Sequence, residues 1–227
     1  MCADNFLLQL PRLVRKANLR GNFIHMSEFI FTPGKGNTAD KVTYALERIS
    51  EAFRVLLWEE NRRNGLSPVQ NQLLIFLLHH SGPLCSVSSL AAEFNMTKPT
   101  ISDAVKVLEK KELVRRTADV QDARVAYLSL TARGKQTARK AGLFAMPVAA
   151  AIAALPESEQ EKMLFHLLQV IRLLYGNGII QQQRMCLNCS HYQPLKAGQF
   201  KCTLLNQTLA AADLRVDCPE HELVITS

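Results

Sequence analysis

The sequence predicts a mainly α-helical protein with one small β-hairpin and a separate cysteine-rich segment at the C-terminal end. Three observations lead to this class. Apolar residues recur at three- and four-residue spacings over most of residues 38–175. Two short β-type runs, 113–116 and 125–130, interrupt the helical pattern. Four of the six cysteines lie in the last 42 residues.

The composition describes a soluble globular protein, with 48% hydrophobic residues among 227 and a formal net charge of +7. The positive charge favours a polyanionic partner. The longest nearly uncharged apolar run, residues 141–155, is only 15 residues long and contains a proline, so we expect no membrane span. In the first 25 residues the basic side chains follow the apolar stretch, the reverse of a secretory signal. We therefore expect a cytoplasmic protein.

Residues 1–36 form an N-terminal extension that ends in a turn-rich segment, 32–36. Met26 is a second candidate start, so residues 1–25 are either an extension without an assigned function or untranslated sequence. A first helix is expected from Thr38 to Asn64, within a segment 37–66, because its apolar residues follow a helical period and Gly65 can adopt the left-handed cap conformation.

The central segment, 67–131, carries three further helices. Ser67 and Pro68 form an N-cap and first helical position for a strongly apolar helix that extends to residue 80. A short helix follows at about 86–94. Thr97 can cap the next helix, in which one apolar face leaves the lysines and hydroxyl groups on the other. These helices are followed by the two β-type runs, joined by a polar loop at 117–124. Helix, strand, loop and strand in this order predict a winged helix-turn-helix.

Two more helices are expected in the segment 132–176. The first is capped by Thr131, extends over residues 132–154 and is bent by Pro147; the second covers residues 158–175. A polar linker then leads into the cysteine-rich tail, so that linker and tail together occupy residues 177–227.

The chemistry of residues 97–140 suits double-stranded DNA. Eleven basic and five acidic residues lie in this stretch, which therefore carries most of the net positive charge. A helix in the major groove must present side chains to base edges while its neighbours hold phosphates, and an arginine at the wing suits the narrow minor groove. We expect Asp122 to orient that arginine. The predicted DNA-binding residues are Thr97, Lys98, Thr100, Ser102, Lys106, Arg115, Arg116, Asp122 and Arg124.

The same region resembles the MarR family of winged helix-turn-helix regulators. The resemblance covers most of residues 67–135 and rests on the segments 90–94, 97–108, 113–116, 119–124 and 128–134. It implies an obligate homodimer whose flanking helices, 38–64 and 132–175, form the interface and whose two recognition helices read a pseudo-palindrome. One departure is Glu112, where the family often has glycine, so we expect a wider or slightly strained turn. Cys85 is expected to be a small buried thiol.

The tail contains the motif Cys186-Leu-Asn-Cys189, followed by Cys202 and Cys218. Four thiolates suffice for a tetrahedral zinc ion or for an iron–sulfur cluster. We expect zinc, because structural zinc is the more common choice; the alternative is an iron–sulfur cluster, because a proline after the last cysteine is typical of ferredoxin clusters. His191 and His221 are either substitutes for one thiolate or hydrogen-bond partners of the ligands. We expect the metal to hold together a segment that is otherwise short of apolar residues.

These observations predict a homodimeric transcription regulator whose affinity for DNA responds to a small-molecule effector or to the metal-binding tail. The alternative is an adaptor whose tail binds a protein or RNA while the winged helix serves as a scaffold. No nucleophile elbow, phosphate-binding loop or dinucleotide-binding glycine pattern accompanies these features, so we expect no enzyme.

Overall fold

The computed structural model describes residues 36–119, 122, 125–195 and 198–223. The contacts of these residues divide the described chain into two units, 36–155 and 156–223. The expected N-terminal extension lies almost wholly outside the described residues. No helix in the described part is long and apolar enough to cross a bilayer.

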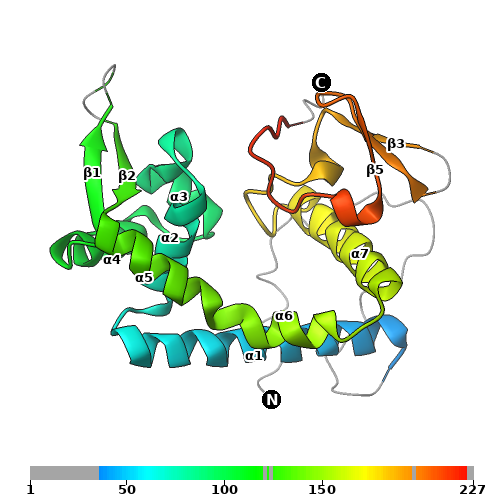
Figure 1. Cartoon of the computed structure of the whole chain (residues 1–227), viewed down its shortest axis with the longest axis horizontal. Helices are drawn as coiled ribbons and strands as arrows, with labels where there is room; N and C mark the ends of the chain where they lie inside the picture. The colour runs from blue at the N-terminus through cyan, green and yellow to red at the C-terminus, as the bar shows by residue number, and fades with distance from the viewer. Residues whose placement is uncertain (1–35, 120–121, 123–124, 196–197, 224–227) are drawn as a thin grey trace, which may run out of the picture. The chain divides into compact units, whose positions relative to one another are not determined.

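The first unit contains the winged helix (Figure 1). Its helices and strands are α1 (Thr38–Asn64), α2 (Pro68–His79), α3 (Val87–Glu93), α4 (Lys98–Lys110), β1 (Val114–Ala118), β2 (Ala126–Leu130), α5 (Ala132–Ala141) and α6 (Met146–Ala153). Short 3₁₀ turns, η4 (Gly82–Cys85) and η5 (Gly142–Ala145), precede α3 and α6. Strands β1 and β2 pair antiparallel, with Arg115 opposite Ser129.

The single bent helix that we expected at 132–154 consists of α5, η5 and α6. The expectation of a bend was correct, but the break lies at residues 142–145, just before Pro147. Proline clashes with the carbonyl four residues earlier, at Leu143, which accounts for the loss of α-helical geometry there.

The core of this unit lies where α2, α3 and α4 meet the hairpin and α5. It consists of fifteen buried residues: Leu66, Leu73, Leu74, Leu77, Cys85, Leu90, Ala91, Ile101, Val105, Leu108, Leu113, Val114, Leu128, Leu130 and Ala138. Cys85 is fully buried, and this burial raises the pKa of its thiol. The three apolar residues of α4 that the sequence placed on one face, Ile101, Val105 and Leu108, are all in this core.

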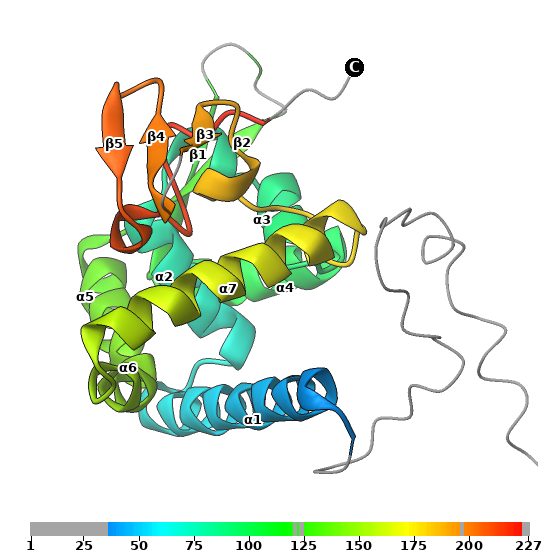
Figure 2. The same ribbon diagram turned by 90° about the vertical axis from the view of Figure 1, so that its right-hand side faces the viewer.

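The second unit combines the last long helix with the cysteine-rich segment (Figure 2). It contains α7 (Glu157–Gly176), η6 (Cys186–Asn188), the strands β3 (Tyr192–Pro194), β4 (Phe200–Cys202) and β5 (Gln207–Leu209), and η8 (Ala211–Asp213). The strands form an antiparallel sheet in the order β3-β4-β5. A small core of Leu168, Met185, Leu187, Phe200, Leu209 and Leu214 joins α7 to this segment.

The position of α7 differs from the sequence-based division of the chain. We expected this helix to belong with α5 and α6 in a segment 132–176, whereas the contacts place the boundary between residues 155 and 156. Leu168 of α7 is 1% exposed and packs in the same cluster as Met185 and Phe200. The tail therefore has an apolar core of its own, which its sequence alone did not indicate.

Candidate nucleic-acid interface and cysteine pocket

Helix α4 presents a hydrophilic face away from the core. Thr97 caps it: the side-chain oxygen accepts from the backbone N–H of Thr100 at 3.3 Å, and the two threonine hydroxyls lie 2.8 Å apart. Lys98, Thr100 and Lys106 are exposed and Ser102 is half-buried. The residues that the sequence assigned to base contact thus share the solvent side of one helix.

Lys106 is paired with a carboxylate on the same helix. Its Nζ lies 2.9 Å from Asp103 Oδ1, and both side chains are largely exposed. Exposed pairs of this kind contribute at most about 1 kcal/mol, so a phosphate group can compete for the lysine.

The hairpin adds two exposed arginines beside α4. Arg115 Nε donates to Ser129 Oγ across the strands at 3.0 Å, and Arg116 Nε lies 3.3 Å from Glu109 Oε1 of α4. These contacts hold the guanidinium stems while their charge stays at the surface. Arg124 lies outside the described residues, so its expected orientation by Asp122 lies outside them as well; the Asp122 backbone N–H donates to Asp119 Oδ1 at 3.0 Å.

The turn between α4 and β1 has the strain that the sequence predicted. Glu112 adopts φ +58°, a left-handed conformation that glycine tolerates far better than other residues. Its carbonyl accepts from Thr131 Oγ1 at 2.7 Å, and the same hydroxyl accepts from the backbone N–H of Gly134 at 2.9 Å. A β-carbon on Gly134 would overlap with the carbonyl oxygen of Leu113. Thr131 and Gly134 therefore fix the start of α5 against the end of the recognition helix.

A polar network fixes the junction of α1 and α2, and the sequence analysis did not identify it. Asn64 Nδ2 donates to Asn71 Oδ1 at 2.8 Å and to Glu60 Oε1 at 3.0 Å. Asn71 is fully buried. Lys111, at the end of α4, donates to the carbonyl of Gly65 at 2.7 Å. The signal was an asparagine in helix 68–79 shortly before its apolar stretch 73–78, since buried amides require partners.

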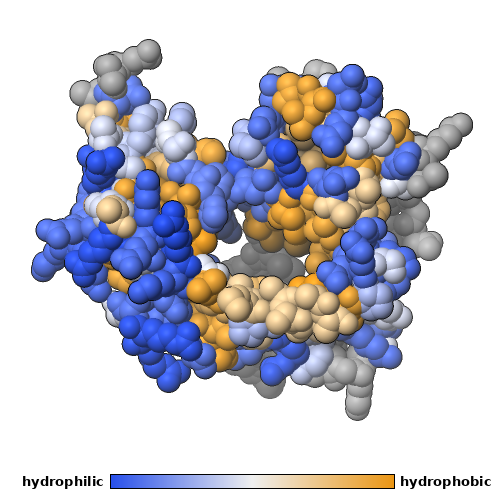
Figure 3. Space-filling model, viewed as in Figure 1, coloured by the Kyte–Doolittle hydropathy of each residue, from blue (hydrophilic) through white to orange (hydrophobic). Residues whose placement is uncertain are grey.

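Two helices of the first unit expose apolar side chains. On α1 only Leu57 and Glu60 are buried, whereas Val42, Leu46, Ile49 and Phe53, spaced four, three and four residues apart, are 36–51% exposed. None of the residues of α6 is buried, although its sequence is entirely apolar. Figure 3 shows this hydrophobic surface over α6 and a hydrophilic surface over the region of α4. Contiguous apolar surface of this kind is typical of an interface.

A polar hollow of about 470 Å³ lies beside these helices, within the first unit. It is lined by Glu60, Arg63, Asn64, Thr137, Lys140 and Leu143.

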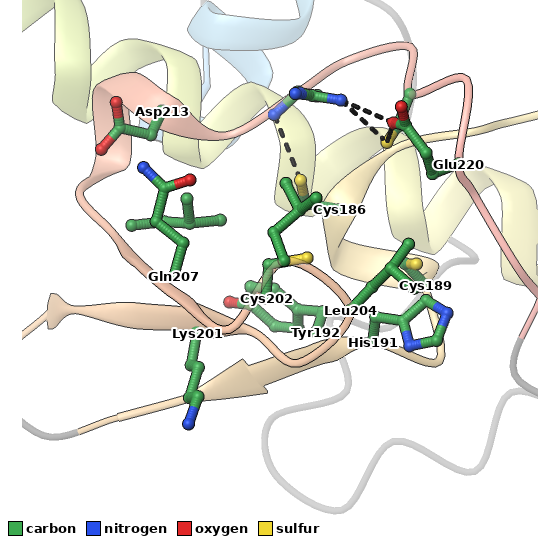
Figure 4. A pocket seen from close by; sticks show the side chains of 14 residues that line it. Cys186, Cys189, His191, Tyr192, Lys201, Cys202, Leu204, Gln207, Asp213 and Glu220 are labelled. Atoms are coloured by element: carbon green, nitrogen blue, oxygen red, sulfur yellow. Dashed lines mark hydrogen bonds and ion pairs between the residues drawn. The ribbon is translucent and has the colours of Figure 1, made fainter.

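The four tail cysteines line a single pocket in the second unit (Figure 4). Burial raises the pKa of the Cys186 thiol, while the backbone N–H of Arg215, which donates to this sulfur at 3.2 Å, acts in the opposite direction. Of the two histidines, His221 Nε2 bonds to Asn188 Oδ1 at 3.0 Å, and His191 Nε2 lies 3.2 Å from Glu222 Oε2. Within the described residues, no three His, Cys, Asp or Glu side chains converge on a point as ligands of one metal ion do.

Comparisons with known proteins match the first unit. Residues 64–125 match the model of the MarR family. The uncharacterised HTH-type transcriptional regulator YxaD of Bacillus subtilis (strain 168) is 35% identical over 82 residues, which are 36% of this chain and 57% of that protein. The chain therefore spans little more than half the length of this curated relative.

Two crystal structures of MepR from Staphylococcus aureus share the fold. One is a MepR–DNA complex, with 24% identity and a TM-score of 0.51 over 59% of this chain and 98% of MepR. The other is MepR in its DNA-binding conformation, with 22% identity and a TM-score of 0.53 over the same shares of the two chains. The likeness confirms the predicted winged-helix fold.

Proposed function

We propose that this chain, whose winged helix is a MarR-family domain, is a transcription regulator that binds double-stranded DNA as a homodimer. The observation that carries the proposal is the solvent face of α4. This face presents Lys98 and two hydroxyl groups to solvent, which are groups that a recognition helix offers to base edges, and Arg115 and Arg116 of β1 extend the positive surface. MepR, which shares the fold, is known in complex with DNA.

The exposed apolar faces support the homodimer. Symmetric association would bury the residues of α1 and α6 that the single chain leaves in water. Two recognition helices related by a two-fold axis read a pseudo-palindromic operator, since each half-site meets an identical helix.

Regulation of affinity by a ligand, or by the cysteine-rich unit, is the second part of the proposal. The polar hollow beside α1 and α5 has charged groups of both signs and adjoins the proposed dimer helices. A small molecule that fits it differently in two arrangements of the dimer would change the affinity for DNA.

DNA binding is tested by fluorescence anisotropy with operator fragments selected from random duplexes. Lys98→Ala and, on the wing, Arg124→Ala should each weaken binding by about 1–3 kcal/mol. Lys162→Ala is the matched control, because this lysine is exposed on α7, in the other unit, and pairs with Glu159. The logarithm of affinity should fall linearly with the logarithm of salt concentration. Salt-independent binding, or equal affinity of all variants, would refute the proposal and leave the adaptor as the better account.

The homodimer is tested separately by sedimentation at several concentrations. Ile49→Glu places a charge in the exposed apolar face of α1 and should yield monomers. Val107→Glu introduces the same charge at a similarly exposed position on α4 and should leave the dimer intact. A monomeric unaltered chain would contradict the proposal.

A further inference from the structure

The cysteine pocket is assembled by backbone pairing between segments that are distant in sequence. The N–H of Cys186 donates to the carbonyl of Arg215 at 3.0 Å, and the N–H of Cys218 donates to the carbonyl of Arg184 at 2.7 Å. These two bonds align the first and last cysteines of the tail. An ion pair between Arg184 Nε and Asp217 Oδ1, at 2.9 Å, joins the same two segments.

The other two cysteines reach the pocket from a tight turn and from the sheet. The N–H of Cys189 donates to the carbonyl of Cys186 at 3.0 Å, which closes the turn between them. Cys202 ends β4, where it lies opposite Tyr192 of β3. Figure 4 shows Cys186, Cys189 and Cys202 around the same cavity, and Cys218 also lines it. Four thiols from separate parts of the tail thus surround one cavity.

Two groups near these thiols suit negatively charged sulfur, whereas the Cys218 thiol also donates to Glu220 Oε2 at 3.4 Å. The Arg215 N–H donates to Cys186 Sγ at 3.2 Å, and its guanidinium Nη1 lies 3.5 Å from Cys218 Sγ. The same Nη1 donates to Glu220 Oε2 at 2.8 Å. Hydrogen bonds and a nearby cation stabilise thiolates, and both tune a metal centre that thiolates bind.

The size of the pocket favours a group larger than a single ion. A zinc ion draws four sulfurs to about 2.3 Å from one point. The pocket that the four thiols line together with ten other residues measures about 240 Å³, and among the described side chains no three potential ligands converge on one point. An iron–sulfur cluster has volume of its own, and its thiolates lie around its outside.

We infer that Cys186, Cys189, Cys202 and Cys218 hold an iron–sulfur cluster in this cavity. This inference differs from the sequence-based expectation of zinc, which rested on the greater frequency of structural zinc sites. It is independent of DNA binding, because every ligand lies in the second unit. Each thiol loses its proton when it binds iron. His191 and His221 need not act as ligands, since four thiolates complete the set.

The test is the metal content of the full-length chain purified without oxygen. We expect a brown protein with iron and acid-labile sulfide in equal amounts, and visible absorption that is lost on oxidation. A preparation that contains no metal is treated with ferrous and ferric iron and sulfide, and should then acquire the same spectrum. Colourless protein with one zinc per chain, or protein that takes up no iron, would overturn the inference.

A pair of variants assigns the ligands. Cys202→Ser should lose at least nine-tenths of the bound iron, whereas Cys85→Ala, which removes the buried thiol of the other unit, should retain it. Because the loss of a ligand can unfold the second unit, the decisive measurement remains that on the unaltered chain. Full retention of iron by Cys202→Ser would exclude Cys202 and refute the four-thiolate set.

Discussion

The two units of this chain are stabilised in different ways. The winged-helix unit has a cluster of fifteen buried residues and helix caps at Asn37, Ser67, Ser86, Thr97 and Thr131. The second unit has a cluster of six, and three strands of three residues each. Small domains with little core are usually stabilised by disulfides or metal. The first unit should therefore fold from its own apolar surface, whereas the second should depend on the metal centre proposed for its cysteines.

The largest expected effect is the loss of stability of the second unit when the proposed metal centre is removed. Metal binding to thiolate sites contributes on the order of 10 kcal/mol to the folding of small domains. Oxidative removal of the cluster should therefore abolish amide hydrogen-exchange protection in the segment 186–218 and leave that of α2 and α4 unchanged. Equal loss of protection in both units would contradict their independent stabilisation, because it would mean that they fold together.

The next effect should be confined to the winged helix. Leu108→Ala removes a fully buried side chain from the core and should lower the free energy of unfolding by about 2–5 kcal/mol, as measured by urea denaturation. The metal content should not change. Leu204→Ala, at a position 49% exposed in the second unit, serves as the control and should leave the unfolding of the winged helix unaltered.

A smaller loss is expected at the contact between α5 and the turn after α4. Gly134→Ala places a methyl group against the Leu113 carbonyl, and the displacement should cost about 1–3 kcal/mol in unfolding experiments. Gly142→Ala is the matched substitution, because a β-carbon there meets no atom within 4 Å. Equal stability of the two variants would show that the close approach is not required.

The smallest effect has the opposite sign. Glu112→Gly should raise the free energy of unfolding of the winged helix by about 0.5–1 kcal/mol, because φ +58° costs glycine little. Thermal denaturation followed by circular dichroism measures the gain. A loss of stability would mean that the glutamate side chain compensates for the strain of its backbone.

The sequence predicted the winged helix closely because its signals are local. Caps at Ser67, Thr97 and Thr131 mark helix starts, and the apolar face of α4 is set by three residues at helical spacing. The residues of α4 outside its apolar face form its solvent face, so the predicted DNA-binding residues of this helix could be recognised from the sequence. Arg124 could not, because it lies outside the described residues.

The predictions that failed or were missed depend on contacts between distant residues. Nothing in the periodicity of 157–176 indicates that Leu168 packs with Phe200. Similarly, the sequence predicts a metal site from four cysteines, but only the fold shows that all four line one pocket. The partners of Asn71 also became evident only from the fold.

The amide network at Asn64 and Asn71 has a consequence for how two half-sites are matched. It sets the angle at which α1 leaves the winged helix, and Lys111 ties the end of α4 to the same junction through Gly65. In a homodimer joined through α1, that angle occurs twice, once on each side of the two-fold axis. The distance between the two recognition helices then depends on the stiffness of this joint. If the chain forms the proposed homodimer, the number of base pairs between operator half-sites depends in part on the contact between Asn64 and the fully buried Asn71.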